Sequence, residues 1–274
     1  MKLLNGRELA EFIKERQAKQ VRALRQAEHI LPKLAIIKTT DNPVIEAYVR
    51  MKKRYGEDIL VDVDVHTVAS DKLFAAIEKC NNDDLVHGII VQLPLVDPSQ
   101  TTSAVNLVAR HKDVDGLRQD ALFTPATPMA IDWLLGGYNI DLAHKHIAIV
   151  GQGRLVGKPL AELWQKAGYD IEVFDKDSEN TMERLKHADV IITATGVPGL
   201  IMSSSVRQGA VVVDAATSSE DGKIIGDVAD EVRQRDDITI TPEKGGVGPL
   251  TVSALFDNVI RAARARAEAA AKTR

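Results

Sequence analysis

The chain has 274 residues, 45% of them hydrophobic and 27% charged, and its 35 Lys and Arg against 39 Asp and Glu residues give a net charge of −4. This length predicts a large core divided between two domains. The near-neutral charge and the 4% aromatic content argue against a nucleic-acid-binding protein. The single cysteine, Cys80, excludes a disulfide framework and a multi-cysteine zinc module.

Residues 1–20 are charged and amphipathic and lack the apolar segment of a signal peptide. No window approaches the roughly 20 apolar residues of a membrane-spanning helix. His144 and His146 have no partnering ligands in the sequence, so we expect no metal site. The chain is therefore predicted to be cytoplasmic, without a nucleic-acid or membrane partner.

The first half alternates predicted helices and strands. Apolar spacing predicts a long helix over the first 30 residues and another from Pro43 to Gly56. We also expect a short apolar run, two strands and two further helices, in chain order Leu34–Ile37, Ile59–Val68, Leu73–Cys80, His87–Gln92 and Thr101–Arg110. This alternation is typical of a mostly parallel sheet with crossover helices.

The second half reads as a separate α/β unit of the Rossmann type. After a helix at about Met129–Leu135, the pattern predicts strands at Ile147–Val150, Ile171–Phe174, Val190–Thr193, Ala210–Asp214 and Ile238–Ile240. Helices are expected after Gly157, at Thr181–Lys186 and from about Thr251 to Ala270. The predicted fold is therefore two α/β domains.

A glycine pattern marks the cofactor site. Gly151, Gly153 and Gly157 follow a predicted strand and open a predicted helix. In that context glycines permit the tight turn and the close approach of the backbone to a pyrophosphate, while the helix N-terminus supplies N–H groups. The second strand of the unit is followed by Asp175, where an acid would accept hydrogen bonds from the ribose 2′-OH of NAD and repel the 2′-phosphate of NADP. Its neighbour Lys176 partly offsets that repulsion.

Polar residues in the first half indicate a catalytic site. Tyr48 and Lys52 share one helix face, and Gln92 ends a buried strand, where ligand sites of open α/β sheets lie. Lys112-Asp-Val-Asp-Gly116 places carboxylates on a tight turn. A second glycine-rich turn, Lys244-Gly-Gly-Val-Gly-Pro-Leu-Thr251, allows backbone to approach a flat ligand.

Taken together, these segments resemble the bifunctional methylenetetrahydrofolate dehydrogenase/methenyltetrahydrofolate cyclohydrolase family. The matching segments, in family order across nearly the whole chain, are Asp41-Asn-Pro43, Tyr48-Val-Arg-Met-Lys52, Asn81-Asn-Asp83, Val86-His-Gly-Ile-Ile-Val-Gln-Leu-Pro-Leu95, Lys112-Asp-Val-Asp-Gly116, Thr127-Pro128, Val156-Gly-Lys-Pro-Leu160, Gly226-Asp-Val228 and Gly245-Gly-Val-Gly-Pro-Leu-Thr251. Each segment alone is weak evidence for the family, but their combination and order are specific to it.

The resemblance implies an activity and residue roles. The enzyme would oxidise 5,10-methylenetetrahydrofolate with a nicotinamide cofactor and hydrolyse the methenyl product to 10-formyltetrahydrofolate. Lys52 would be the central catalytic group, oriented by Gln92, while Asp115 would bind the pterin ring and Tyr48 would pack against the aromatic middle of the folate. The resemblance also implies a homodimer. Further substrate contacts are expected at Gly246, Gly248 and Pro249, and cofactor contacts at Gly151, Gln152, Gly153, Gly157, Asp175, Lys176 and Thr217.

The chain departs from the family pattern around the cofactor. The usual Gly-Arg-Ser of the loop is Gly151-Gln-Gly153, and the usual Cys-His-Ser after the second strand is Phe174-Asp-Lys176. The loss of a cation and the gain of an anion both favour NAD over the family-typical NADP. Lys244 also stands where the family usually has proline.

We expect a catalytic, folate-binding domain formed by residues 1–120 and 250–274 and a dinucleotide-binding domain formed by residues 121–249. One alternative is an oxidoreductase similar to shikimate dehydrogenase, although the Asn-Val-Thr-x-Pro-x-Lys segment of that family is absent. A second alternative is a catalytically silent NAD- or folate-binding regulator. Intact Lys52, Gln92 and Asp115 argue against it.

Overall fold

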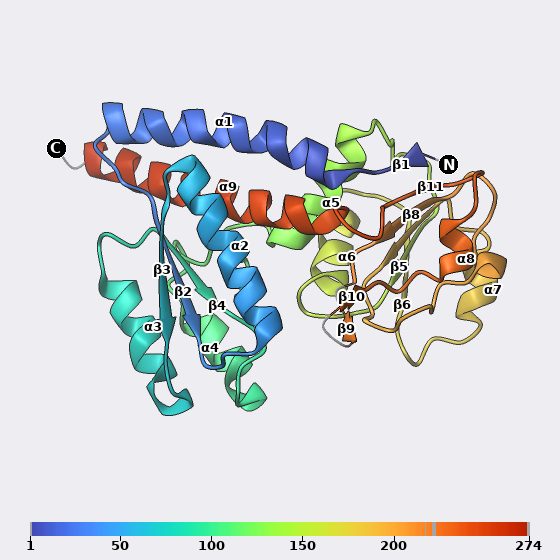
Figure 1. Cartoon of the computed structure of the whole chain (residues 1–274), viewed down its shortest axis with the longest axis horizontal. Coiled ribbons are helices and arrows are strands. Elements are labelled where there is room, and N and C mark those ends of the chain that lie inside the picture. The colour runs from blue at the N-terminus through green and yellow to red at the C-terminus, as the bar shows by residue number, and fades with distance from the viewer. Residues whose placement is uncertain (1, 217, 221–222, 273–274) are drawn as a thin grey trace. The chain divides into compact units, whose positions relative to one another are not determined.

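The computed structural model describes residues 2–216, 218–220 and 223–272 and divides the chain into two compact units. The six-stranded unit consists of Met1–Ala10 and Thr127–Thr251, and the three-stranded unit of Glu11–Ala126 and Val252–Arg274. The divisions fall within the first and last helices, α1 (Gly6–Ala27) and α9 (Val247–Lys272). Both units are α/β (Figure 1), which confirms the predicted fold class.

The three-stranded unit is built on a parallel sheet in the order β3-β2-β4. Its elements after α1 are β2 (Lys33–Lys38), α2 (Pro43–Ile59), β3 (Asp62–Thr67), α3 (Leu73–Asn82), β4 (Gly88–Val91) and α4 (Thr101–Leu107), with short 3₁₀ turns at Ser70–Lys72 and Pro98–Gln100. One face of β2 and β4 packs with α3 and α4 in an apolar core that includes Ile37, Ile77 and Val105. β2 and β4 are buried on both faces, as is usual for parallel sheets, whereas the edge strand β3 has exposed and partly buried residues.

Helix α2 extends beyond its predicted end at Gly56. A Cβ on Gly56 would lie 2.5 Å from a methyl group of Val63 and 2.8 Å from the Val61 carbonyl oxygen. The glycine therefore allows close packing of the helix on β3 and does not stop it. The helix ends at Ile59 because Leu60 adopts a left-handed conformation with φ 66°. The predicted strand Ile59–Val68 accordingly begins three residues later than expected.

The six-stranded unit contains an all-parallel sheet in the order β1-β11-β8-β7-β5-β6. Its elements are β1 (Lys2–Leu3), α5 (Ala126–Gly137), β5 (Ile147–Val150), α6 (Gly157–Lys166), β6 (Ile171–Phe174), α7 (Thr181–Leu185), β7 (Val190–Thr193), a 3₁₀ turn (Ser203–Ser205), β8 (Val211–Asp214), the antiparallel pair β9 (Ser218–Glu220) and β10 (Lys223–Ile225), α8 (Asp230–Arg233) and β11 (Thr239–Ile240). The chain runs from β5 to β6 on one side and then returns to β7 on the other. This reversal is the topological switch point at which dinucleotides bind.

The first and last helices also begin at other residues than predicted. Lys2–Leu3 forms an edge strand paired with Thr239–Ile240, so the first helix begins only at Gly6. The last helix begins at Val247, four residues earlier than expected, because Pro249 is tolerated in a first helical turn.

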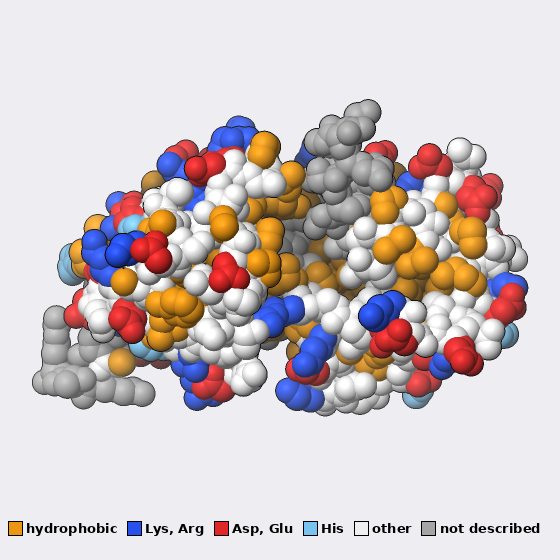
Figure 2. Space-filling model, turned by 90° about the horizontal axis from the view of Figure 1, so that it is seen from below, with side chains coloured by type: hydrophobic (Ala, Val, Ile, Leu, Met, Phe, Trp, Pro, Cys, Tyr) orange, Lys and Arg blue, Asp and Glu red, His pale blue; other side chains and the backbone are white. Residues whose placement is uncertain are grey.

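The surface carries mixed charge. On the face shown in Figure 2, Lys and Arg side chains are interspersed with Asp and Glu side chains. None of the helices among the described residues combines the length and hydropathy that a membrane span requires.

Candidate functional site

The three-stranded unit places Tyr48 and Lys52 on one face of α2. The helix starts at Pro43, and the side-chain oxygen of Asn42 accepts a hydrogen bond of 2.9 Å from the Val44 N–H. This cap fixes where the helix begins and hence which residues face inward. Tyr48 and Lys52 are one turn apart, and both are half-buried.

Lys52 is joined to Gln92. The Lys52 Nζ donates to Gln92 Oε1 at 2.8 Å, and Gln92 Nε2 donates to the Leu93 carbonyl at 3.0 Å. The second bond fixes the orientation of the amide, so that its oxygen faces the lysine. Gln92 directly follows β4, and its backbone N–H donates to the Ile37 carbonyl at 2.8 Å. The pair therefore lies at the carboxyl edge of the sheet, where the sequence placed it.

Asp115 stands on a rigid turn that follows the same sheet. The buried Lys112 donates through Nζ to the carbonyls of Cys80, Asn81 and Asp83 at 3.0, 2.8 and 2.7 Å. These three bonds anchor the start of the turn to the end of α3.

The end of the turn requires glycine. Gly116 has φ 69°, and a Cβ there would lie 2.7 Å from the Phe123 carbonyl oxygen. Asn258 on α9 donates to the Val114 carbonyl at 2.9 Å, and Val114 itself is fully buried. Asp115 is thus presented by a backbone held on both sides.

Lys52 and Asp115 carry opposite charges, and each charge partly offsets the effect of burial on the pKa of the other group. Burial of its ammonium group lowers the pKa of Lys52 from the usual 10.5, and the Asp115 charge partly opposes this change. Burial likewise raises the pKa of Asp115 above 3.8, and the Lys52 charge opposes it. The structure therefore brings Lys52, Gln92 and Asp115 together as one site with a lysine suited to lose a proton.

Asp113 is a further acid of this turn that sequence reasoning missed. It is only 2% exposed, and its oxygens accept from the backbone N–H groups of Leu117 and Arg118 at 3.3 and 3.0 Å. Burial raises its pKa to about 6, and the Asp115 charge acts in the same direction. Its place in the Asp-Val-Asp-Gly turn was the available signal, but only the fold shows that the Asp113 side chain caps the turn.

In the six-stranded unit, the glycine loop lies at the switch point between β5 and β7. Gly151 has φ 104°, and a Cβ there would lie 2.6 Å from the Ala194 carbonyl oxygen. A Cβ on Gly157 would overlap the Gly151 carbonyl oxygen, so the first turn of α6 packs directly on the loop. Around Gly153 a Cβ would meet its nearest atom only at 4.0 Å. The loop therefore has the close packing and the open backbone that fit a dinucleotide pyrophosphate.

Asp175 follows β6 next to this loop. Its Oδ1 accepts from the Asp177 N–H at 3.0 Å and from the Ser178 hydroxyl at 2.9 Å. These bonds hold the pKa of the exposed Asp175 below its usual value, so the carboxylate is charged at neutral pH. Gln152 lies in the loop, where its Nε2 donates weakly to the Gly151 carbonyl at 3.4 Å. Lys176 follows Asp175 and is exposed, and the predicted contact Thr217 lies outside the described residues.

Asp227 is a second residue to which the sequence analysis gave no role. Its side chain anchors the backbone at the carboxyl end of β7. It is fully buried, and its Oδ2 accepts from the Thr193 hydroxyl at 2.6 Å and from the Thr195 N–H at 2.7 Å. It thereby fixes the chain as it leaves β7 beside Gly151. Asp227 belongs to Gly226-Asp-Val228, one of the matched segments, but its long-range contacts are invisible in the sequence.

The second glycine-rich turn leads into α9. Gly245 has φ 88°, and a Cβ on Gly6 would overlap the Gly246 carbonyl oxygen. Gly248 and Pro249 lie in the first turn of α9, and a Cβ on Gly248 would meet no atom within 4 Å. The described residues contain no group of three or more His, Cys, Asp or Glu side chains arranged to hold a metal ion.

Two family models match the chain. The catalytic domain of tetrahydrofolate dehydrogenase/cyclohydrolase matches residues 4–115, and the NAD(P)-binding domain of the same family matches residues 125–267. These matches confirm the family resemblance and an NAD(P)-binding domain, and they favour it over a shikimate-dehydrogenase-like enzyme.

Individual relatives match this chain over nearly their full lengths. The bifunctional protein FolD of a Hydrogenobaculum strain is 36% identical, covering 97% of this chain and 100% of that protein. The crystal structure of the bifunctional methylenetetrahydrofolate dehydrogenase/cyclohydrolase FolD from Campylobacter jejuni is 34% identical, with a TM-score of 0.90 over 97% of this chain and 99% of that one. The Trypanosoma brucei enzyme, solved with NADP and an inhibitor, is 25% identical, with a TM-score of 0.89 over 96% and 97% of the two chains.

Proposed function

This chain belongs to the tetrahydrofolate dehydrogenase/cyclohydrolase family, and we propose that Lys52, Gln92 and Asp115 serve both of the family's reactions. It is a bifunctional enzyme of tetrahydrofolate one-carbon metabolism, with methylenetetrahydrofolate dehydrogenase and methenyltetrahydrofolate cyclohydrolase activities. The observation that carries the residue assignment is the 2.8 Å bond from Lys52 to Gln92 beside the opposing charge of Asp115.

In the dehydrogenase reaction, Asp115 accepts hydrogen bonds from the amino and amide N–H groups of the pterin and so holds the folate in one orientation. Tyr48 packs against its aromatic middle, and Gly246, Gly248 and Pro249 provide close backbone contacts. Residues Gly151, Gly153 and Gly157 would hold the dinucleotide, whose nicotinamide would supply the acceptor for the hydride of the methylene carbon. Because the methenyl product is a cation, a lysine that is neutral disfavours it less than a charged one, and the lowered pKa of Lys52 supports this role.

In the cyclohydrolase reaction, Lys52 moves the proton. Water adds to the methenyl carbon, and the proton that this oxygen loses passes to the neutral Lys52 Nζ. The bond between the carbon and N5 then breaks, that proton passes from Lys52 to N5, and the remaining hydroxyl proton leaves to solvent as the carbonyl forms. The formyl group stays on N10, and one proton is released in the overall reaction. Gln92 keeps the amine directed toward the reacting carbon throughout, since its oxygen accepts from Nζ.

For the cofactor, we propose that residues 121–249 bind NAD in preference to NADP. Gly151, Gly153 and Gly157 form the pyrophosphate cradle, with Gln152 and Thr217 as further contacts. Asp175 would accept hydrogen bonds from the ribose hydroxyls, and its charge would repel a 2′-phosphate. Lys176 offsets part of that repulsion, so the expected preference is moderate.

The proposal includes the domains and the assembly. Residues 1–120 and 250–274 would form the catalytic, folate-binding domain, although residues 1–10 belong to the six-stranded unit. The resemblance implies a homodimer, and the absence of a signal peptide in residues 1–20 favours a cytoplasmic enzyme. Sedimentation velocity at micromolar concentration checks the dimer directly.

A single assay tests the function and the cofactor preference. The purified enzyme with methylenetetrahydrofolate should reduce NAD with a higher kcat/KM than NADP, followed by nicotinamide absorbance. A preference for NADP would contradict the role of Asp175, and no turnover with either would favour a catalytically silent protein. Lys52→Met should abolish hydrolysis of the methenyl product; unchanged hydrolysis would remove Lys52 from its role.

A further inference from the structure

Asp227 is a fully buried carboxylate that neither proposed reaction uses. Its Oδ2 accepts from the Thr193 hydroxyl at 2.6 Å and from the Thr195 N–H at 2.7 Å. Its other oxygen, Oδ1, is buried and has no hydrogen-bond donor among the residues that the structure describes. Burying a carboxylate with an unpaired oxygen costs free energy of folding, so stability alone is a poor reason for its presence here.

The segment that Asp227 holds lies against the glycine loop of the dinucleotide site. Ala194 stands between the two residues that Asp227 bonds. Its carbonyl oxygen would lie 2.6 Å from a Cβ on Gly151 and 4.0 Å from a Cβ on Gly153. The Ala194 carbonyl therefore borders both glycines whose open backbone fits the pyrophosphate. A shift of Thr193–Thr195 would move this border.

Asp227 is itself fixed from the other side by Asp214, at the end of β8. The Asp227 and Val228 N–H groups donate to the two carboxylate oxygens of Asp214, each at 3.2 Å. Arg233 on α8 donates to Asp214 Oδ2 at 2.5 Å and compensates the buried charge of that carboxylate. A Cβ on Gly226 would overlap the Asp214 carboxylate, so only glycine lets the chain come this close. The Asp227 side chain therefore acts on the end of β7 from a backbone that is itself held in place.

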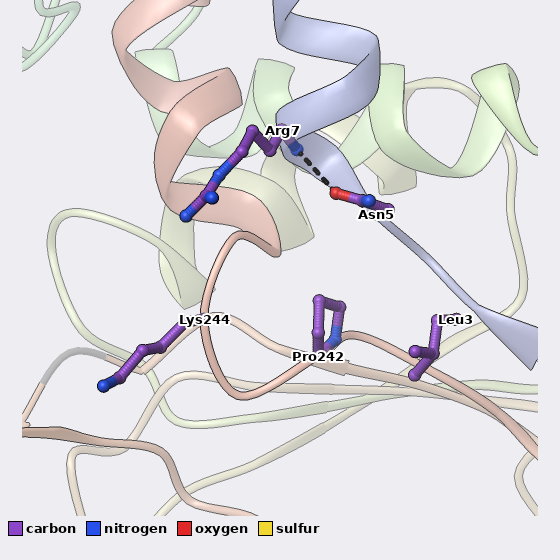
Figure 3. Close-up of a pocket in the computed structure, with 5 residues that line it drawn as sticks. All are labelled: Leu3, Asn5, Arg7, Pro242 and Lys244. Carbon is purple, nitrogen blue, oxygen red and sulfur yellow. Dashed lines mark hydrogen bonds between the residues drawn. The ribbon is translucent and has the colours of Figure 1, made fainter.

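A ligand cavity does not account for Asp227. Figure 3 shows a cavity of about 160 Å³ in the same unit, lined by Leu3, Asn5, Arg7, Pro242 and Lys244. These residues belong to or follow β1 and β11, which lie three and two strands away from β7 in the sheet. Asp227 is not among them, so this cavity gives its buried carboxylate no role.

We propose that Asp227 is a positioning residue for the dinucleotide. It fixes the Ala194 carbonyl beside Gly151 and Gly153 and thereby sets how tightly the loop binds the pyrophosphate. The proposal rests on the proposed cofactor site, because it requires this loop to hold the pyrophosphate. Since NAD and NADP share the pyrophosphate, Asp227 affects both cofactors equally, whereas Asp175 affects the choice between them.

The test measures the binding of NADH and of NADPH to the purified full-length enzyme through nicotinamide fluorescence. Asp227→Leu is similar in size but accepts neither bond, so both Kd values should rise about tenfold, the equivalent of about 1.4 kcal/mol, with their ratio unchanged. Thr193→Val removes one of the two bonds and should raise both Kd values about threefold, whereas Thr193→Ser keeps the hydroxyl and should restore binding. Asp227→Asn can accept both bonds through its one amide oxygen and should bind nearly as tightly as the wild type.

Ser205→Ala is the matched control. Ser205 is another buried hydroxyl of this unit, but it donates to the Met202 carbonyl at 2.7 Å, in the turn before β8. Its loss should leave both Kd values close to those of the wild type. Hydrolysis of the methenyl substrate uses no dinucleotide and should continue in every variant, which reports correct folding. If Asp227→Leu also loses hydrolysis, the comparison of Thr193→Val with Thr193→Ser decides.

Kd values that stay within about twofold of the wild type in both Asp227→Leu and Thr193→Val would overturn the proposal, as would a loss confined to NADPH. Gly157→Ala separates this outcome from failure of the proposed site. If Gly157→Ala weakens binding while Asp227→Leu does not, the loop binds the dinucleotide and only the role of Asp227 is wrong. If neither variant weakens binding, the loop is not the site and both proposals fail.

Discussion

Replacing Gln92 by methionine tests whether its bond to Lys52 matters for catalysis. Methionine has nearly the same length and shape but cannot accept the hydrogen bond from Lys52 Nζ, which is 2.8 Å long. A hydrogen bond to a charged group contributes about 1.5–3 kcal/mol. If the bond is needed to direct the amine in the transition state, cyclohydrolase kcat should therefore fall roughly 10- to 150-fold.

The same substitution should move the pH profile. The Gln92 oxygen stabilises the ammonium form of Lys52, so its removal lowers further a pKa that burial has already lowered from 10.5. Because the neutral amine accepts the proton from water, hydrolysis should rise with pH as Lys52 loses its proton. In Gln92→Met that rise should occur at lower pH than in the wild type.

The assay is the loss of methenyl absorbance, followed as a function of pH after subtraction of the uncatalysed hydrolysis. Gln26→Met serves as the control, because Gln26 is an exposed residue near the end of α1. A Gln92→Met enzyme with the wild-type rate and the wild-type pH profile would refute the role of this bond.

Two other substitutions test the two units one at a time. Asp113→Asn should flatten the pH dependence of stability: because the folded pKa of about 6 exceeds the ordinary 3.8, the wild type loses up to about 3 kcal/mol as pH rises from about 4 to above 6. Guanidinium unfolding at pH 4 and 7 measures this, and a wild-type slope in the variant would contradict the assignment. Gly157→Ala should lower dehydrogenase activity at least tenfold and spare hydrolysis, because the new methyl group overlaps the Gly151 carbonyl. Gly136→Ala, where a Cβ meets no atom within 4 Å, is its control, and equal loss of both activities in Gly157→Ala would point to misfolding instead.

Strands with a fully buried apolar run were predictable from the sequence. The bounds of β5 and β7 agree with the prediction to the residue: β5 is an apolar run between His146 and Gly151, and β7 follows Asp189 and ends at the polar Thr193. Prediction was poorer where one residue type is compatible with two structural roles. Gly56 was interpreted as a helix stop, but its small size serves close packing on Val63. The two-residue strand Lys2–Leu3 has no local signal at all, since it exists only through its pairing with Thr239–Ile240.

For the catalytic site, the sequence suggested which residues matter but not how they are held. Lys52, Gln92 and Asp115 were predicted from their motifs, and the structure adds the bond and the opposed charges that join them. The support given by Lys112 and Asp113 could not be predicted, because a charged residue on a turn is usually solvated. Their burial depends on carbonyl and N–H groups that only the folded chain brings near.

The buried charges of this turn explain how one site can contain an acid and a base of altered pKa without losing its geometry. Lys112 donates to three backbone carbonyls and Asp113 accepts from backbone N–H groups, so the backbone holds both side chains in place. The Asp115 charge nevertheless helps to raise the pKa of Asp113. The backbone bonds thus fix the turn, while the charges of Lys52 and Asp115 act on each other. Substitution of Lys112 should consequently reduce stability first, whereas substitutions of Lys52 or Gln92 should reduce rate while leaving stability nearly unchanged.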